Sequence, residues 1–399
     1  MNKKVTYLSF ALVFTFLVFF STTSGLSTPS QTVPSSGSIT YNDPVTPDYT
    51  VSTLAQLKTV MSQVVAGNLV YIRGGTYQPT SQLTFARSGN SGSPITFAAY
   101  PGETVIFDGT SYIPSSQTFS GFVMITGSWI TLRGIEVCNA QAGQSNGNHG
   151  IQIRGSDCVL DHCKMYNNAG MGAFTMGTRT KFLYCIAHDN VDNGPNQANG
   201  GNADGFGCQR GSNAYYLGCL AYANSDDGFD NLDGHGCIVE SCVSYGNGLL
   251  GGDGAGFKVG VNEIVIKCIA FNNNLEGFTV PLSDTSRDGN DTFDHCTAYN
   301  NGIATPSKPA SGRAAFDTSA PGCVFTNNIG ASYWWGSTPR TQTDNTWNLG
   351  ITNYGFVSTD TTSANYLSLS ATSLCRGKAS DGTDLGALQY GERIGDLLA

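Results

Sequence analysis

The sequence predicts an all-β fold, a single-stranded right-handed parallel β-helix with an N-terminal capping helix and an irregular C-terminal tail. Two observations carry this prediction. A cysteine followed five positions later by an asparagine recurs every 22 to 34 residues, and a Gly-Phe pair recurs with it. Repeats of this kind are typical of a solenoid whose coils of short strands stack on one another. A chain of 399 residues can therefore form one structural unit.

The first repeat places two rows of side chains along the predicted solenoid. Stacked asparagines can hydrogen-bond one another and the turn backbone, and stacked cysteines can fill a narrow apolar interior. The cysteine row is Cys163, Cys185, Cys219, Cys242, Cys268 and Cys296, and the asparagine row is Asn168, Asn190, Asn224, Asn247, Asn273 and Asn301. The sequence has no C-x-x-C pair, so we expect buried, mostly unpaired thiols rather than zinc ligands.

The repeat also extends beyond these six copies. We align Gly134 with the cysteine row in an earlier copy, which places Asn139 in the asparagine row. In a later copy, Asn328 stands at the cysteine position and the downstream asparagine is lost.

The first residues predict export. A basic start and an apolar run from Val5 to Phe20 precede small polar residues, so residues 1–25 are expected to be a cleaved signal peptide. The run is shorter than the ~20 apolar residues that span a bilayer comfortably, and we expect no membrane attachment after cleavage. The mature protein is therefore expected to be secreted to the extracellular space, periplasm or cell surface, and to be a monomer. A net charge of −9 argues against nucleic acid as a partner.

The ends of the mature chain depart from the repeat. Residues 26–50 are rich in Ser, Thr and Pro and are expected to form a linker or N-terminal extension. Residues 51–399 are expected to form the β-helix domain with its terminal caps. Helical periodicity from Ser52 to Val65 predicts the N-terminal cap, and loss of the repeat from Trp334 to Ala399 predicts a C-terminal cap or lateral tail.

The Gly-Phe pair aligns a second set of residues. It occurs in Asp204-Gly-Phe206, Asp227-Gly-Phe229, Ala255-Gly-Phe257 and Glu276-Gly-Phe278. If these phenylalanines stack inward at the strand spacing of ~4.8 Å, residues at fixed offsets from them lie above one another. Asp204 and Asp227 are then neighbours, and Lys258 lies one coil beyond Asp230.

This alignment predicts a metal site. Four aspartates on two adjacent coils, Asp204, Asp226, Asp227 and Asp230, would repel one another strongly without a cation. Calcium accepts about six to eight oxygen ligands and suits such a cluster. The alternative is a polar turn without a ligand, which leaves the alignment of Lys258 unexplained.

These motifs resemble a known family. Asp204-Gly-Phe, Ser225-Asp-Asp-Gly-Phe-Asp230 and Gly256-Phe-Lys258, on a β-helix with cysteine and asparagine rows, are similar to the polysaccharide lyase family 9 pectate lyases. The resemblance covers nearly all of the mature chain and is most specific over residues 200–260. It implies that Asp204, Asp226, Asp227 and Asp230 bind calcium and that Lys258 is the catalytic base.

The implied activity is calcium-dependent cleavage of polygalacturonate, an acidic plant polysaccharide, by β-elimination to 4,5-unsaturated products. Residues 51–399 would then be the catalytic domain. Five cations are candidates for binding sugar carboxylates: Arg210, Lys267, Arg287, Lys308 and Arg313. Asp233 and Asp253 are turn residues or outer-shell metal ligands.

The sequence leaves three alternatives. The chain could be a lyase acting on rhamnogalacturonan or another polyuronide. It could instead be a β-helix polygalacturonase, a hydrolase that uses two carboxylates as acid and base. It could also be a non-catalytic polysaccharide-binding surface protein, because a fold alone does not decide function.

Overall fold

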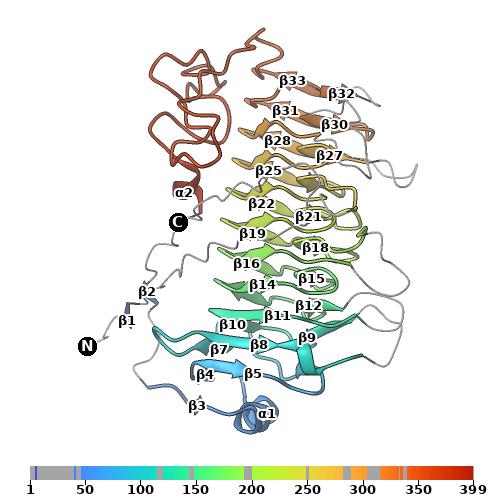
Figure 1. Ribbon diagram of the computed structural model, residues 1–399, viewed down its shortest axis with the longest axis vertical. Coiled ribbons are helices and arrows are strands. Elements are labelled where there is room, and N and C mark those ends of the chain that lie inside the picture. Colours follow the sequence, from blue (N-terminus) through green and yellow to red (C-terminus); the bar gives the residue numbers. More distant parts are fainter. Residues whose placement is uncertain are drawn as a thin grey trace, which may run out of the picture.

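A computed structural model confirms the parallel β-helix (Figure 1). It describes residues 5–6, 40–41, 46–114, 120–142, 148–192, 200–248, 251–281, 289–302, 315–331, 333–335 and 339–398. The predicted signal peptide and linker therefore lie largely outside the described residues. Within them, β1 (Val5–Thr6) pairs antiparallel with β2 (Thr40–Tyr41). Across the described part of the chain, no helix has the length and apolar character needed to cross a membrane.

Each complete coil contributes one strand to each of three parallel sheets, and the coils at the two ends contribute fewer. Sheet 1 is β3 (Tyr49–Val51), β4 (Leu69–Ile72), β7 (Ile95–Ala99), β10 (Ile130–Arg133), β13 (Val159–Asp161), β16 (Lys181–Leu183), β19 (Tyr215–Leu217), β22 (Ile238–Glu240), β25 (Ile264–Ile266), β28 (Thr292–Asp294), β31 (Val324–Thr326) and β33 (Thr341–Thr343). Sheet 2 is β5 (Gly75–Tyr77), β8 (Val105–Asp108), β11 (Ile135–Cys138), β14 (Lys164–Tyr166), β17 (Ile186–His188), β20 (Leu220–Tyr222), β23 (Val243–Tyr245), β26 (Ile269–Phe271) and β29 (Thr297–Tyr299). Sheet 3 is β6 (Leu83–Phe85), β9 (Gly121–Ile125), β12 (His149–Ile153), β15 (Ala173–Thr175), β18 (Phe206–Cys208), β21 (Phe229–Asp230), β24 (Phe257–Lys258), β27 (Phe278–Val280), β30 (Phe316–Thr318) and β32 (Tyr333–Trp335).

The N-terminal end of the core is covered by α1 (Leu54–Gln63), as predicted. The helix begins where the Thr53 side chain accepts a hydrogen bond from the Gln56 backbone N–H, which satisfies one free donor of the first turn. Its buried face, Leu57, Val60 and Met61, joins the main apolar core.

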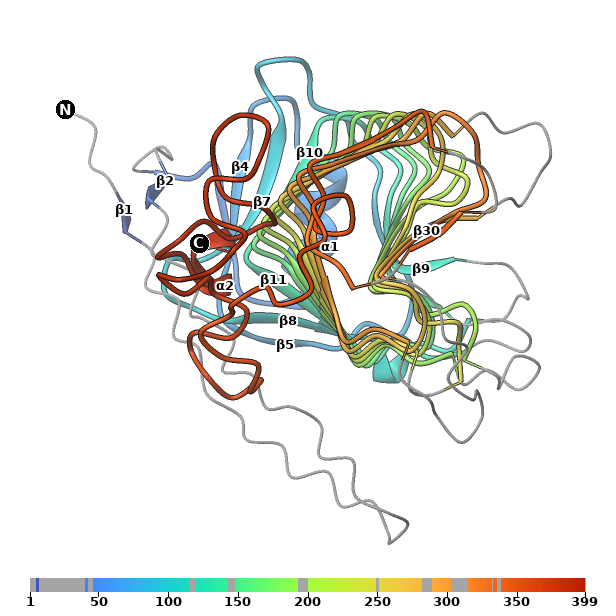
Figure 2. The same ribbon diagram turned by 90° about the horizontal axis from the view of Figure 1, so that it is seen from above.

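The C-terminal tail lies beside the β-helix, outside the stacked coils (Figure 2). The repeat runs further than predicted, because β33 extends to Thr343. Beyond it, tail residues that include Tyr366, Leu388 and Ile394 of α2 (Ile394–Leu397) pack against the outward apolar side chains of sheet 2. A short 3-10 helix, η1 (Gly109–Ser111), follows β8.

The structure confirms both predicted rows. In the asparagine row, each Nδ2 donates to the Oδ1 of the asparagine in the next coil at 2.8 to 3.0 Å. The twelve cysteines of the chain are all described, and all are buried and free of disulfides. Asn328 does occupy the cysteine position, because its Oδ1 accepts the backbone N–H of Cys296 at 2.7 Å.

The earlier copy of the repeat was placed wrongly by one residue. Ala140, not Asn139, donates its backbone N–H to the Asn168 side chain and so occupies the asparagine position. By the same register, Ile135 rather than Gly134 occupies the cysteine position. Gly134 instead forms the left-handed turn before the strand, with φ of 67°. Because strand side chains alternate, a shift of one residue exchanges the inner and outer positions.

Candidate functional site

Sheet 3 positions the predicted site through a stack of buried phenylalanines. The rings of Phe206, Phe229, Phe257 and Phe278 stack with centroids 4.7 to 5.1 Å apart. The strand pairing that follows places Asp230 beside Lys258 in the neighbouring coil. The alignment predicted from the Gly-Phe pairs is therefore confirmed.

The glycine of each pair has a packing role that sequence reasoning missed. A Cβ on Gly205 would lie 2.7 Å from the Gly228 carbonyl oxygen and 3.0 Å from Nδ2 of Asn224. Contacts this short exclude a side chain. Because glycine has no side chain, the start of each of these sheet 3 strands can lie close to the asparagine row. This close approach brings Asp204 and the residues at the same position in neighbouring coils into register.

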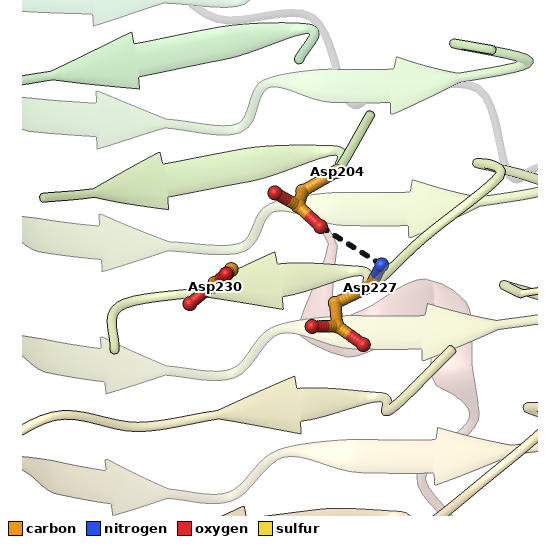
Figure 3. A group of neighbouring side chains, drawn as sticks. All are labelled: Asp204, Asp227 and Asp230. Atoms are coloured by element: carbon orange, nitrogen blue, oxygen red, sulfur yellow. Dashed lines mark hydrogen bonds between the residues drawn. The ribbon is translucent and has the colours of Figure 1, made fainter. Parts of the chain in front are cut away.

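Three aspartates meet beside strands β18 and β21 of sheet 3 (Figure 3). Asp204, Asp227 and Asp230 each have a carboxylate oxygen within 4.8 Å of the others, and all three side chains are buried. Asp204 and Asp227 directly precede the Gly-Phe pairs of adjacent coils, and Asp230 ends β21. The backbone N–H of Asp227 donates to Asp204 Oδ1 at 2.9 Å, which links the two coils at this point.

Lys258 completes this group from the next coil. Its Nζ lies 2.6 Å from Asp227 Oδ2 and 3.8 Å from Asp230 Oδ2. Asp227 is therefore its nearest partner, although the sequence alignment pointed to Asp230. The lysine side chain is 16% exposed, whereas the Asp227 side chain is fully enclosed.

Asp226 lies next to this group but is not one of the three carboxylates that meet. Its Oδ1 accepts the backbone N–H of Asp253 at 2.6 Å, and the residue is buried. Asp253 therefore contacts Asp226 through its backbone N–H, and its own side chain is exposed. Asp233 is partly exposed in the turn after β21, where its carbonyl accepts the N–H of Arg210.

Burial dominates the electrostatics of the aspartates. It raises the pKa of Asp204 well above its ordinary value, with Asp226, Asp230 and Asp227 adding to the effect. Burial and then the charge of Asp227 raise the pKa of Asp226 to about 8. Burial lowers the pKa of Lys258, but the surrounding aspartates more than offset this and leave it raised.

The donor set fits a divalent cation. Three enclosed carboxylates within 4.8 Å of one another offer closely spaced hard oxygen ligands, which calcium prefers. Without a counter-charge, burial opposes the ionisation of Asp204 and Asp227, and a single lysine balances only one of the negative charges. These carboxylates are the residues that could hold a metal ion.

Most of the five cations predicted to bind sugar carboxylates lie away from the aspartates or outside the described residues. Lys267 is exposed in the turn between β25 and β26, which joins sheets 1 and 2, so it does not lie on sheet 3 with the aspartates. Arg210 is exposed in the turn after β18. Arg287, Lys308 and Arg313 lie outside the described residues.

Comparisons with known sequences place the chain in a family. Residues 39–312 match the family model described as the Pel9A-like, right handed beta helix region. Pectate lyase L of Dickeya chrysanthemi is 30% identical over 335 residues, which cover 76% of this chain and 73% of that protein. Pectate lyase PEL9 of Emericella nidulans is 29% identical, with 62% of this chain and 68% of that protein covered. Pectate lyase L of Dickeya dadantii is 31% identical, with 61% and 60% covered.

Two solved structures share the fold. Pectate lyase Pel9A superposes with a TM-score of 0.68 and 24% identity, covering 87% of this chain and 98% of that one. A rhamnogalacturonan lyase superposes with a TM-score of 0.64 and 23% identity, covering 86% and 91%. Both confirm the β-helix architecture. The match of the family model and the 30% identity to pectate lyase L of Dickeya chrysanthemi show that the chain belongs to the Pel9A-like right-handed β-helix family, the polysaccharide lyases that its motifs resemble.

Proposed function

We propose that the chain is a calcium-dependent pectate lyase, which cleaves polygalacturonate by β-elimination and leaves 4,5-unsaturated products. The observation that carries this proposal is the buried group of Asp204, Asp227 and Asp230 with the Lys258 ammonium 2.6 Å from Asp227. The names of the relatives, which are pectate lyases from a fungus and from bacteria, support this choice of substrate.

Asp204, Asp227 and Asp230 would hold the ion, with Asp226 as the adjoining fourth carboxylate. Bound there, calcium would supply Lewis-acid stabilisation of the charge that develops next to the C6 carboxylate of the sugar. The protein contributes rigid placement. Asp227 Oδ1 accepts the Ala255 N–H at 2.6 Å and Asp230 Oδ1 accepts the Leu232 N–H at 2.8 Å, so both carboxylates are oriented by backbone.

Lys258 would remove the proton from C5 of the sugar. Its amine must be neutral to do so, and the aspartates oppose this by raising its pKa. When the negative charge of the aspartates is balanced, the burial of Lys258 remains. Burial lowers the pKa of the amine and favours its neutral form. The electrons of the C5–H bond then form the C4–C5 double bond, the C4–O bond breaks, and the departing oxygen takes up a proton. No water is consumed.

The test is an absorbance assay on purified protein with polygalacturonate. A rise in ultraviolet absorbance from the unsaturated products, lost with a chelator and restored by calcium, is the expected result. New reducing ends without absorbance would identify a hydrolase instead. Rhamnogalacturonan and alginate in the same assay define the substrate, and binding without turnover on every polyuronide would contradict the enzymatic proposal.

We further propose that the protein is secreted and acts as a monomer on extracellular pectin. The apolar run from Val5 to Phe20 behind a basic start supports export. N-terminal sequencing of protein from the culture medium should begin after a cleavage between Ser24 and Leu26. Intact residues 1–25 on the mature protein would contradict this.

A further inference from the structure

A chain of three buried polar side chains lies inside the β-helix, next to Asp230. The Tyr216 hydroxyl donates to Asn231 Oδ1 at 3.0 Å, and Asn231 Nδ2 donates to Glu263 Oε2 at 3.2 Å. Each of the three residues is at most 1% exposed. Asn231 directly follows Asp230, so this chain of hydrogen bonds holds the neighbour of a residue in the proposed calcium site.

Backbone hydrogen bonds around Asn231 link the position of this residue to the proposed calcium site. The Leu232 N–H donates to Asp230 Oδ1 at 2.8 Å, which orients one carboxylate oxygen. The Asn231 N–H donates to the Lys258 carbonyl at 2.8 Å, and its carbonyl accepts the Gly234 N–H at 2.6 Å. A displaced Asn231 would therefore move the Asp230 carboxylate and loosen the link to Lys258 together.

Glu263 is held against the turn that Asn231 begins. A Cβ on Gly234 or on Gly260 would lie 3.1 Å from Glu263 Oε1, so the carboxyl packs closely against the backbone of these two glycines. Oε1 has no hydrogen-bond partner in the described residues, and the backbone N–H of Glu263 is bound by Asp291 Oδ1 at 2.8 Å. Burial raises the pKa of Glu263 well above its ordinary value, which favours the protonated form. A buried carboxyl is unfavourable for folding, so a positioning role accounts for its presence.

We infer that Glu263 is a positioning residue of the calcium site, acting through Asn231 on the Asp230 carboxylate. The inference rests on the proposed function, because it assumes that Asp230 binds the ion. Residues that orient metal ligands without touching the metal commonly change affinity by about 10- to 100-fold.

The test is calorimetric titration of the full-length protein with calcium chloride, with the melting temperature measured for each variant. Glu263→Leu removes the acceptor for Asn231 Nδ2 and should weaken calcium binding about tenfold or more. Glu263→Gln keeps an oxygen in that place and should bind within about twofold of wild type. Asn328→Ala, in a distant part of the same β-helix, should lower the melting temperature and leave calcium binding unchanged.

Each outcome decides a different point. Unchanged calcium affinity in Glu263→Leu, or an equal loss in Glu263→Gln, would overturn the inference. If Glu263→Leu does not fold, Tyr216→Phe decides instead: about threefold weaker binding supports the inference and unchanged binding overturns it. A wild-type protein that takes up no calcium would overturn the proposed function, and this inference with it.

Discussion

Replacing Lys258 with alanine should abolish turnover and strengthen calcium binding. The ammonium is hydrogen-bonded to Asp227 Oδ2 at 2.6 Å and lies 3.8 Å from Asp230 Oδ2, where it competes with a cation for the same oxygens. Removing it deletes the proposed base and also relieves that competition. The catalytic rate should therefore fall while the affinity for calcium rises.

The expected magnitudes follow from these distances. A positioned general base contributes about 100- to 10,000-fold in rate, so the variant should lose about 3 to 5 kcal/mol of transition-state stabilisation. Two unit charges about 4 Å apart interact by about 4 kcal/mol at an effective dielectric constant of about 20. Loss of the lysine charge from beside the carboxylates that would hold the ion should tighten calcium binding by at least about tenfold after screening and relaxation.

The assay combines initial rates of product absorbance with calcium titration of the same preparations. Lys181→Ala is the matched control, because it removes an exposed lysine from sheet 1 and should change neither quantity. Lys258→Arg keeps the charge, but its guanidinium stays protonated at any working pH, so it should be as inactive as the alanine variant. A Lys258→Ala protein that retains more than about a tenth of wild-type activity would refute the assignment of the base.

Four further predictions follow from the same geometry. Activity should rise with pH, because the aspartates raise the pKa of Lys258 and the base must be neutral. Added calcium should balance the charge of the aspartates and shift this rise to lower pH, so a pH profile that calcium does not move would contradict the prediction. Without calcium, the protein should lose stability as pH rises from about 4 toward 8, because the pKa of Asp226 is raised from 3.8 to about 8 in the fold and its ionisation there is opposed; melting temperatures with and without chelator should diverge over this range. Gly205→Ala should destabilise the fold by about 1 to 3 kcal/mol in denaturant titration, because its Cβ would lie 2.7 Å from the Gly228 carbonyl; an unchanged midpoint would show that the strand can move. Asn224→Ala should also cost about 1 to 3 kcal/mol, because it removes the acceptor of the buried Asn190 N–H and Nδ2 and one of the two donors to Asn247 Oδ1; an unaltered stability would argue against the row as a structural element.

The repeat made the architecture predictable from sequence. In a parallel β-helix, equivalent residues of successive coils pair directly, so aligning two motifs in the sequence also aligns them in space. This is why the Gly-Phe pairs correctly placed Asp230 beside Lys258, and why both side-chain rows were found. The same logic failed for Gly134 and Asn139, because a one-residue shift still matches an asparagine and only strand pairing distinguishes the two registers.

Side-chain directions were decided by the tertiary structure. Strand register fixes where a Cα lies, but the flexible four-carbon side chain of Lys258 turns toward Asp227 rather than toward its paired neighbour Asp230. Asp226 and Asp227 are adjacent in sequence, yet only Asp227 joins the three carboxylates that meet.

The contact between Asn231 and Glu263 has no motif at all in the sequence. It joins residues 32 positions apart, one in the turn after β21 and the other in the turn after β24 of the next coil, where the coil-to-coil repeat no longer predicts neighbours. The sequence by itself therefore determined the stacked coils and the row of carboxylates with its lysine. Which oxygens face one another, and which buried groups support them, depended on how each turn packs against the next coil.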